Sequence, residues 1–552
     1  MLLVWTIFLP LLGAIVLGIA SALSQSAQDR ALRNNALKAA ALGITLLTFA
    51  LSLGFLGGAP RELHYRWIGT LGASLHLRLD GVSLWLFLLT AFLMPICVLA
   101  SWRSILTPRD PHSASDWGEA HEEERGVGGF LVCLLLTEAA ILGTFAAFDL
   151  LLFFFFWEMM LIPMYFLIGI WGSPGVRDSF FFGRVPERIY ATIKFVLYTM
   201  AGSALMLVGI IWLRLETGSF DVEVITQYVQ AGGLARTAQF WLFWAFFVAF
   251  AIKVPVFPFH TWLPDAHTQA PTAGSMILAG VLLKLGTYGI LRFCLPWFPE
   301  AVATYAGLVS VLAVVGILYG ALVAMVQPDM KRLVAYSSIS HLGFVLLGLF
   351  AGNNIGVQGA VLQMVNHGLS TGALFMLVGM LYERRHTRLI ADFGGIARSM
   401  PIYAAFFLII TLSSIGLPAT NGFVGEFLIL LGTFLTEGRT VYAVLGTLGV
   451  IFAAVYMLWM VQRVFFGPIR HEENRSVADL SVREVLAILP IVVMVFWIGL
   501  FPKPFLDRMD AEGWITELQK AGRPKEGAIG GIQEAPWLAE RPTLFRQGEQ
   551  KE

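Results

Sequence analysis

The sequence has few of the residues on which soluble proteins depend. Only 13% of its 552 residues are charged, 57% are hydrophobic, and the mean hydropathy is +0.73. These values exclude an ordinary soluble globular protein. The 37 lysines and arginines balance the 37 aspartates and glutamates, so no basic excess indicates nucleic acid as a partner.

Residues typical of cofactor sites are scarce as well. The three cysteines, Cys97, Cys133 and Cys294, lie singly in apolar runs and form no C-x-x-C pair. They therefore give no framework for disulfides or an iron–sulfur cluster. No glycine-rich nucleotide loop and no metal-ligand cluster is visible in the sequence. We expect no cofactor, no metal and no redox chemistry in this chain.

Long apolar runs are what the sequence has in abundance. Runs able to cross about 30 Å of hydrocarbon recur throughout and predict an all-α polytopic membrane protein. The first run lacks a basic segment before it, so we expect it to be retained as a span. About fourteen spans are expected near 2–22, 36–57, 80–101, 127–147, 149–171, 190–213, 238–258, 272–296, 303–326, 331–351, 357–382, 401–436, 440–466 and 481–502.

Two of these spans contain features that would break a helix. In the seventh, Lys253 stands in the middle of the apolar run 241–267, with Pro255 and Pro258 close behind it. A charge in the bilayer costs about 2.5–3.5 kcal/mol on insertion scales, and proline removes a backbone donor. The twelfth span is too long for one crossing and is interrupted at 416–422. Irregular backbone at that depth is tolerated only inside protein or beside a wet cavity.

The positions of the two breaks predict an internal repeat. Spans 4–8 and spans 9–13 form two units of five helices, and the fourth helix of each is the broken one. An odd number of crossings makes the two units inverted relative to each other, which is a transporter signature. The expected divisions are an N-terminal three-helix segment (1–126), a first repeat (127–297), a second repeat (302–467), a final helix (468–502) and an external tail (503–552).

The connecting segments indicate orientation. Arginine and lysine are concentrated in the loops after spans 1, 3, 5, 9, 11 and 13, where we also placed Lys331. By the positive-inside rule these loops face the cytoplasm and both termini lie outside. The stretch 58–80 alternates apolar and polar residues and predicts an external hairpin. One short helix is expected near 510–521 of the tail.

Glu158 and Lys253 are the strongest pair of candidates for ion handling. Glu158 lies in an apolar run with nothing nearby in sequence to neutralise it, so we expect it to be protonated or paired with Lys253. A pair of this kind can be switched by a modest change of field, as a proton relay requires. A static structural ion pair, or a Lys253 that snorkels to the interface, is the simpler alternative.

Four further residues extend this candidate relay. Lys284 is flanked by glycines on span 8, and His341 and His367 lie on successive spans with serines and Asn366 nearby. Histidine suits proton exchange near neutral pH. We placed Glu426 in the first turn of its half-helix, where the helix dipole favours an anion. We placed Lys253 at the C-terminal end of its half-helix, where the dipole favours a cation. A helix-capping lysine and ordinary core histidines remain the alternatives.

Three other ionisable residues are weaker candidates. Glu138 and Lys194 lie at plausible membrane depth and could be local ion pairs or interface residues. Asp149 lies at the tight junction between spans 4 and 5.

The motifs around these residues resemble a known family. The segments are DLLLFFFFWEMMLIPMYFLIGIWG, KVPVFPFHTWLPDAHTQAPTAGSMILAGVLLKLGTYG, QPDMKRLVAYSSISHLGF, GLPATNGFVGEF and YMLWMVQRVFFGP. They are similar to the antiporter-like membrane subunits of respiratory complex I, the NADH:quinone oxidoreductase, from about Leu79 to Pro468. The resemblance implies fourteen helices in inverted repeats and a functional role for Glu158, Lys253, Lys284, His341 or His367, and Glu426.

The resemblance also implies a function and partners. The expected function is proton translocation in the membrane arm of the complex, in a bacterial-type inner membrane, driven by quinone reduction in other subunits. NADH, FMN, iron–sulfur clusters and quinone would belong to those subunits, and the partners would be other membrane-arm subunits, sister antiporter-like chains and the lipid bilayer. The sister antiporter-like chains and the multisubunit cation/proton antiporters are expected to carry a lysine where this chain has Glu426. The tail 503–552 is longer than the family leads us to expect.

Three alternatives share some of these features. A cation/proton antiporter subunit and a membrane subunit of an energy-converting hydrogenase use the same fold. A redox protein could bind haem through His341 and His367. Sodium flux would reveal the antiporter subunit, and a nickel–iron partner subunit would reveal the hydrogenase subunit. A haem spectrum would reveal the redox protein.

Overall fold

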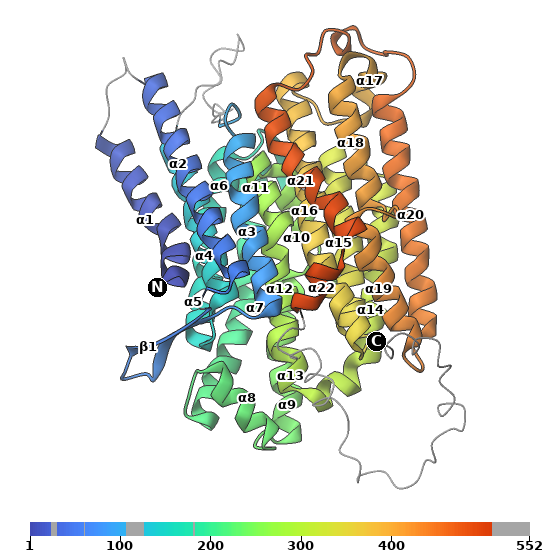
Figure 1. Cartoon of the computed structure of the whole chain (residues 1–552). Helices are drawn as coiled ribbons and strands as arrows, with labels where there is room; N and C mark the ends of the chain where they lie inside the picture. Colours follow the sequence, from blue (N-terminus) through green and yellow to red (C-terminus); the bar gives the residue numbers. More distant parts are fainter. Residues whose placement is uncertain (24–29, 60, 106–125, 180–182, 510–552) are drawn as a thin grey trace, which may run out of the picture.

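The computed structural model describes residues 1–23, 30–59, 61–105, 126–179 and 183–509. This part of the chain is mostly helical, and Figure 1 shows the helices gathered in one bundle that runs between an upper and a lower end. Twelve of its helices are long and apolar enough to cross a membrane. Two interrupted helices complete the fourteen predicted crossings, so the expected all-α polytopic fold is confirmed.

The helices before the first break follow the predicted spans closely. The N-terminal segment consists of α1 (Leu2–Leu23), α2 (Arg30–Leu53) and α3 (Gly81–Ala100). The first repeat then begins with α4 (Val127–Ala146), α5 (Leu150–Met159), α6 (Leu161–Trp171) and α7 (Glu187–Thr217), and the short amphipathic helix α8 (Val222–Gln230) follows α7.

The predicted span 149–171 is divided into α5 and α6, an irregularity that we did not expect. Met160 lies between the two helices, directly after Met159. Pro163 explains the irregularity, because a proline has no N–H to donate to the carbonyl four residues before it.

The remaining helices complete both repeats. The first repeat ends with α9 (Arg236–Lys253), α10 (Trp262–Gln269), α11 (Thr272–Ile277), α12 (Leu283–Gly289) and α13 (Leu295–Trp297). Two π-helical stretches join α11, α12 and α13 into one continuous span. The second repeat comprises α14 (Pro299–Met325), α15 (Met330–Leu349), α16 (Asn354–Arg385), the short α17 (Ile396–Ser399), α18 (Pro401–Ser414), α19 (Asn421–Leu435) and α20 (Thr440–Phe465). The chain continues with α21 (Val482–Leu500) and α22 (Lys503–Met509).

A repeated junction makes the inverted repeat visible. Asp149 and Asp329 each precede the second helix of their unit and cap its first turn by accepting two backbone N–H bonds. Each also forms an isolated antiparallel bridge with the segment after the third span, Asp149 with Asp221 and Asp329 with Leu389. The first bridge lies towards the end of the bundle that carries α8, and the second towards the end that carries α17 (Figure 1). The two units therefore have opposite orientations.

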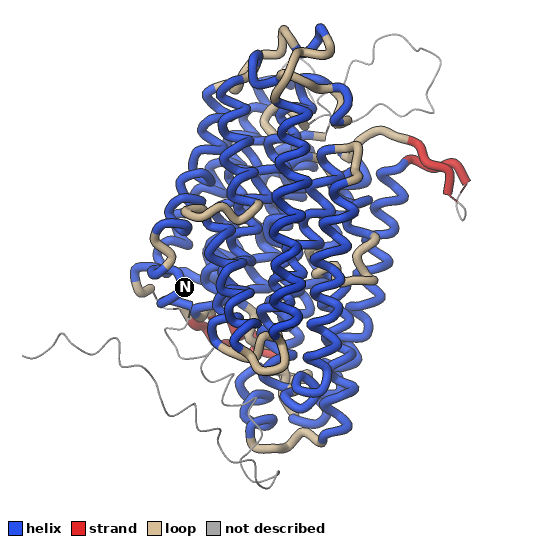
Figure 2. The backbone as a smooth tube through the Cα atoms, turned by 90° about the vertical axis from the view of Figure 1, so that its right-hand side faces the viewer, coloured by secondary structure: helices blue, strands red, loops and turns tan. Residues whose placement is uncertain are grey.

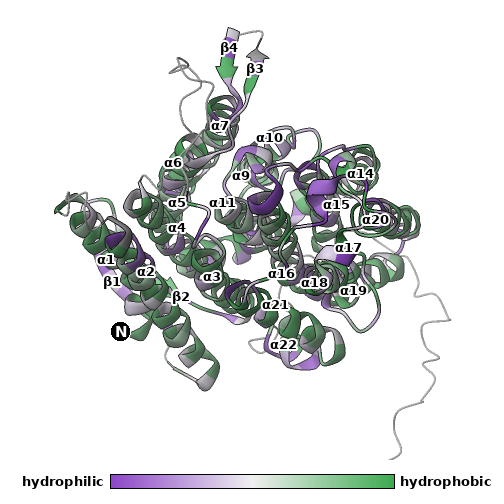
Figure 3. Ribbon diagram, turned by 90° about the horizontal axis from the view of Figure 1, so that it is seen from above, coloured by the Kyte–Doolittle hydropathy of each residue, from purple (hydrophilic) through white to green (hydrophobic). Residues whose placement is uncertain are grey.

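The core of the bundle is where the two repeats meet. The apolar windows of Thr272–Trp297 and Asn354–Arg385 are buried throughout, whereas that of Leu2–Leu23 is only 39% buried. Seen from above, α16 lies near the centre and α1 and α2 lie at one edge (Figure 3). Helices that are apolar on all sides belong in such a core, so polar groups on α12 and α16 are surrounded by protein.

Two hairpins lie at opposite ends of the bundle (Figure 2). The predicted one consists of β1 (Glu62–Ile68) and β2 (Ala73–Arg78), which pair antiparallel. A second hairpin, β3 (Val176–Ser179) and β4 (Gly183–Pro186), was not predicted. The helix that we predicted near 510–521 lies outside the described residues, and α22 is the described part of the tail.

Candidate functional site

The first break places Lys253 at the end of a half-helix, as predicted. Helix α9 ends at Lys253, and the chain is not helical again until Trp262. The Trp262 indole donates a hydrogen bond of 2.8 Å to the carbonyl of Ile252. This bond satisfies a carbonyl that the break leaves without an intrahelical partner, which is why a broken helix can persist in the core.

The environment of Lys253 differs from the predicted one. Lys253 is 2% exposed, and its Nζ has no hydrogen-bond partner among the described residues. The ammonium lies 4.8 Å from the ring centroid of Trp157, which is within the range of a cation–π contact. Ser203 fixes that ring by accepting a 3.0 Å hydrogen bond from the indole. Trp157 is thus the immediate partner of the lysine.

The predicted contact between Glu158 and Lys253 is therefore wrong. No ion pair within 4.0 Å joins them in the described structure, although Glu158 is near enough to act on Lys253 through its charge. Glu158 instead lines a lateral cavity of about 700 Å³, and its Oε1 is buried without a hydrogen-bond partner in the described residues. Adjacent residues of one helix turn point about 100° apart, so Trp157 faces the lysine while Glu158 faces the cavity.

A glycine brings Lys253 close to the next candidate. A Cβ atom added at Gly286 of α12 would lie 3.1 Å from the Cβ of Lys253 and 2.7 Å from the carbonyl oxygen of Phe250. Backbone contact of this kind requires a residue without a side chain. Gly286 is two residues beyond Lys284, so the two lysines stand on helices in close contact.

Lys284 is wholly buried and makes two contacts. Its Nζ donates to the carbonyl of Ala279 and lies 2.7 Å from Nδ1 of His367. Ala279 belongs to the π-helical stretch Leu278–Leu282. Such stretches interrupt the regular i→i−4 bonding and are frequent at functional sites. Lys284 lies in mid-span, so it is not the helix-capping lysine that we considered as an alternative.

The line continues through both histidines to Glu426. The rings of His367 and His341 are 5.8 Å apart between centroids. His341 Nδ1 lies 2.9 Å from Oε1 of Glu426, which also accepts a 3.1 Å hydrogen bond from Gln363. All of these side chains are at most 4% exposed. The structure thus brings together four of the six predicted site residues, with both histidines included.

Glu426 lies near the second break, but further along the helix than we predicted. Helix α18 ends at Ser414, and α19 starts at Asn421. Gly416 and Ala419 in between have φ near +74°, a left-handed conformation that turns the chain sharply. Glu426 is the sixth residue of α19, so the prediction that it lies in the first turn is wrong. Its stabilisation comes from His341 and Gln363 more than from the helix dipole, whose effect fades after one turn.

Sequence reasoning missed two buried ionisable residues next to this line. His267 is fully buried on α10, stacks on Phe375 at 4.6 Å, and has no hydrogen-bond partner on either ring nitrogen among the described groups. It lies close enough to Lys284 and Lys331 to feel both charges. Lys331, which we had placed in a loop, is 6% exposed and donates a 2.5 Å hydrogen bond to Ala270 O.

The signals for these two residues were present in part. His267 lies inside the broken segment that we singled out, but only the fold brings it near Lys284. Lys331 is the second residue of α15, in the turn that Asp329 caps, and its burial depends on the packing of α10 against α15.

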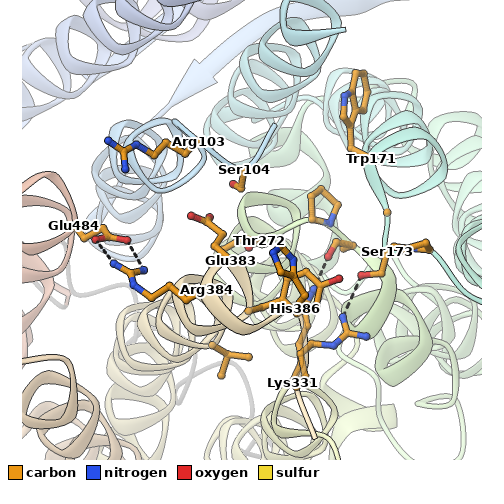
Figure 4. A pocket seen from close by; sticks show the side chains of 18 of the residues that line it. Arg103, Ser104, Trp171, Ser173, Thr272, Lys331, Glu383, Arg384, His386 and Glu484 are labelled. Carbon is orange, nitrogen blue, oxygen red and sulfur yellow. Dashed lines mark hydrogen bonds and ion pairs between the residues drawn. The ribbon is translucent and has the colours of Figure 1, made fainter. Parts of the chain in front are cut away.

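Lys331 also lines a polar cavity at the end of the bundle that carries α17. The cavity has a volume of about 410 Å³ and is formed by residues of both repeats and of the N-terminal segment. Figure 4 shows Lys331 at one side, with Thr272, Glu383 and His386 nearby and the Arg384–Glu484 ion pair at another side. His267 thus lies within electrostatic reach of Lys331 at the cavity and of Lys284 in the buried line.

The weaker candidates have mainly structural contacts. Lys194 pairs with Asp265 at 2.8 Å, which is the local ion pair that we considered. Asp149 caps α5 and accepts two hydrogen bonds from Ser74 of the hairpin. Glu138 is fully buried, and neither of its carboxyl oxygens has a partner within the described residues.

Comparisons with known proteins agree with this architecture. Residues 147–453 match the family described as "NADH:quinone oxidoreductase/Mrp antiporter, TM". The NADH-quinone oxidoreductase subunit M of Rhodobacter capsulatus is 42% identical over 516 residues, 91% of this chain and 93% of the relative. Subunit M of Pseudomonas aeruginosa is 44% identical over 458 residues, 82% of this chain and 84% of the relative.

A solved structure extends the likeness to three dimensions. One chain of the respiratory complex I from Thermus thermophilus with bound NADH is 32% identical and superposes with a TM-score of 0.80. The match covers 95% of this chain and 100% of that chain. The chain therefore belongs to the NADH:quinone oxidoreductase/Mrp antiporter family of membrane proteins, in which its relatives are M subunits of NADH-quinone oxidoreductases.

Proposed function

We propose that this chain is a proton-translocating membrane-arm subunit of an NADH:quinone oxidoreductase and that its buried polar line carries the protons. The observation that supports this most is the succession of Lys284, His367, His341 and Glu426, with contacts of 2.7 and 2.9 Å at its two ends and 5.8 Å between the two imidazole ring centroids. Polar groups that are costly to bury in a membrane protein usually mark an ion pathway. These four groups all exchange protons.

The first step of the mechanism is electrostatic. Glu158 faces a lateral cavity where a neighbouring subunit can change the local field, and it acts on Lys253 through its charge. Lys253 is held on Trp157 without a hydrogen bond, so little opposes a change in its protonation or position. A proton or field change at Lys253 then reaches Lys284 across the contact at Gly286.

The following steps run along the line. Lys284 passes a proton to His367, the two histidine rings exchange it, and His341 passes it to Glu426. Glu426 releases it towards the external side. Moving one charge against 100 mV costs about 2.3 kcal/mol. Neighbouring groups therefore need to change the proton affinity of each relay residue only modestly.

Reloading of Lys284 uses the second branch. Lys331 lines the polar cavity, and His267 lies within electrostatic reach of both Lys331 and Lys284. His267 has no fixed hydrogen-bond partner among the described residues, so it is free to accept a proton from water and to donate it. The cavity lies on the side with the arginine-rich loops, which we assign to the cytoplasm.

The rest of the assembly supplies the driving reaction. Quinone reduction, with NADH, FMN and iron–sulfur clusters, takes place in other subunits, and this chain contributes translocation without redox chemistry of its own. We place it in a bacterial-type inner membrane with both termini outside. The sister antiporter-like subunits are its partners in the membrane arm.

Substitutions at the start of the relay test this function. We expect Glu158→Gln and Lys253→Ala to leave the complex assembled while proton pumping in reconstituted vesicles falls at least tenfold, and NADH oxidation falls with it if coupling is tight. Lys503→Ala, which removes an exposed lysine, is the control. Pumping equal to that of the control would overturn the assignment. Sodium-dependent flux that is insensitive to quinone inhibitors would favour a cation/proton antiporter instead.

A further inference from the structure

A cluster of histidines and carboxylates on the β1–β2 hairpin has no part in the relay. His64 and His76 face each other across the two strands, and their rings stack at 4.5 Å with an angle of 7°. His76 is 1% exposed and His64 is exposed. Two imidazoles that face each other across a pair of strands repel each other when both are protonated. Packing alone therefore does not explain why both positions carry histidine.

Two carboxylates contact the buried ring of His76. Its Nδ1 lies 2.7 Å from Oδ2 of Asp221, and its Nε2 lies 3.1 Å from Oε1 of Glu62. Burial lowers the pKa of His76, but the hydrogen bonds and charges of Asp221 and Glu62 outweigh burial, so the pKa is raised. Two carboxylates thus flank one buried imidazole at the hairpin.

The residue types and their proximity also match a transition-metal site, at which the stacked rings would turn to point one nitrogen each at the ion. Ligand atoms of His64, His76 and Asp221 all lie within 4.8 Å of one another. The other oxygen of Asp221 is fixed by the backbone N–H groups of Glu223 and Val224. Glu62 stands at the second nitrogen of His76, where the ligating histidines of metal sites have a carboxylate partner.

We propose that His64, His76 and Asp221 bind a zinc ion on the external end of the hairpin. Two imidazole nitrogens and one carboxylate oxygen form a donor set that suits Zn²⁺, and a water molecule would complete four-coordination. His76 binds through Nδ1 and keeps its Nε2 proton on Glu62. Binding releases one proton, from Nδ1 of His76, and breaks its hydrogen bond to Asp221.

The ion would join two parts of the chain that meet at this end. His64 and His76 belong to the hairpin after span 2, whereas Asp221 follows the third span of the first repeat and caps α8. Asp149, which caps the helix of Glu158, already bridges Asp221 and hydrogen-bonds Ser74 of the hairpin. Zinc would therefore fix the hairpin to the junction at which α5 begins.

Zinc binding to the intact purified complex tests the proposal. The complex is stripped with a chelator, titrated with Zn²⁺ alone, and its retained zinc is counted by mass spectrometry. We expect His64→Ala to retain one zinc fewer than the wild type at a concentration that saturates the site. Glu62→Gln, which alters only the carboxylate beside Nε2, should bind about 10-fold more weakly.

Matched variants and a structural readout complete the test. Asp221→Asn keeps the helix cap but offers a poorer ligand, so it should also lose the zinc. His471→Ala removes a histidine outside the cluster and should bind like the wild type. Zinc should slow amide exchange in residues 62–78 of the wild type and leave His64→Ala unchanged. Equal zinc content and equal exchange in the wild type, His64→Ala and Asp221→Asn would overturn the site, whatever the pumping activity.

Discussion

Replacing Gly286 by alanine tests how closely the two lysines of the relay must approach. A Cβ at this position would lie 2.7 Å from Phe250 O and from a methyl group of Val254, and 3.1 Å from the Cβ of Lys253. Ordinary contacts of a Cβ start near 3.4 Å. The end of α9, which carries Lys253, must therefore move away from α12 by more than half an ångström, and the backbone carbonyl cannot rotate aside as a side chain could.

The structure gives the size of the effect. Overpacking of a dense core costs about 1–3 kcal/mol, which a protein of this size withstands. The displacement acts directly on the Lys253–Lys284 step, and a misplacement near 1 Å can slow a chemical step by about 100-fold. We expect Gly286→Ala to assemble normally and to pump protons about 10- to 100-fold more slowly.

The assay compares proton uptake with NADH oxidation in vesicles that contain the intact complex. Gly43→Ala is the control, because a Cβ there meets nothing within 4 Å and alanine favours a helix by about 1 kcal/mol over glycine. The reasoning is refuted if Gly286→Ala pumps like Gly43→Ala while the complex of each is equally stable.

Four further substitutions have defined outcomes. Glu426→Gln keeps a polar group beside Gln363 but cannot exchange protons with His341, so pumping should fall at least tenfold in the vesicle assay while assembly is unchanged. Lys331→Met should slow proton uptake from the side of the polar cavity, and single-turnover measurements should show a slow reloading phase that the wild type lacks. Arg384→Met removes two 2.8 Å hydrogen bonds from Glu484, which is 4% exposed, so the free energy of unfolding should fall by about 3–5 kcal/mol in thermal denaturation. Arg475→Met breaks an exposed pair and should cost under about 1 kcal/mol, and equal losses for both arginines would contradict this account.

The spans were predictable because an apolar helix must have a minimum length to cross the bilayer. Each expected span overlaps an observed helix, and both breaks occur where Pro255 and the 416–422 segment interrupt an apolar run. Inversion of the repeats followed from the odd number of helices per unit. The bridges of Asp149 and Asp329, which make the repeat visible, depend on contacts between distant segments and had no signature in one sequence.

The site was predictable in composition but not in contacts. Apolar surroundings identified Glu158, Lys253 and Lys284, since a buried charge is costly wherever it lies. The rotation of α5, which turns Trp157 instead of Glu158 towards Lys253, is set by packing that a sequence does not reveal. Lys331 was missed because its position at a helix start looks like a loop, and its burial comes from α10 of the other repeat.

Lys284→Met removes the residue at which all parts of the proposed relay meet. Lys284 joins the Lys253 step, the His267 branch and the histidine line, and methionine fills its volume without a proton to give. We expect an assembled complex in which proton translocation through this subunit is abolished, measured as protons moved per NADH oxidised. An unchanged ratio of protons to NADH would contradict it, because no other path between the described stations avoids Lys284.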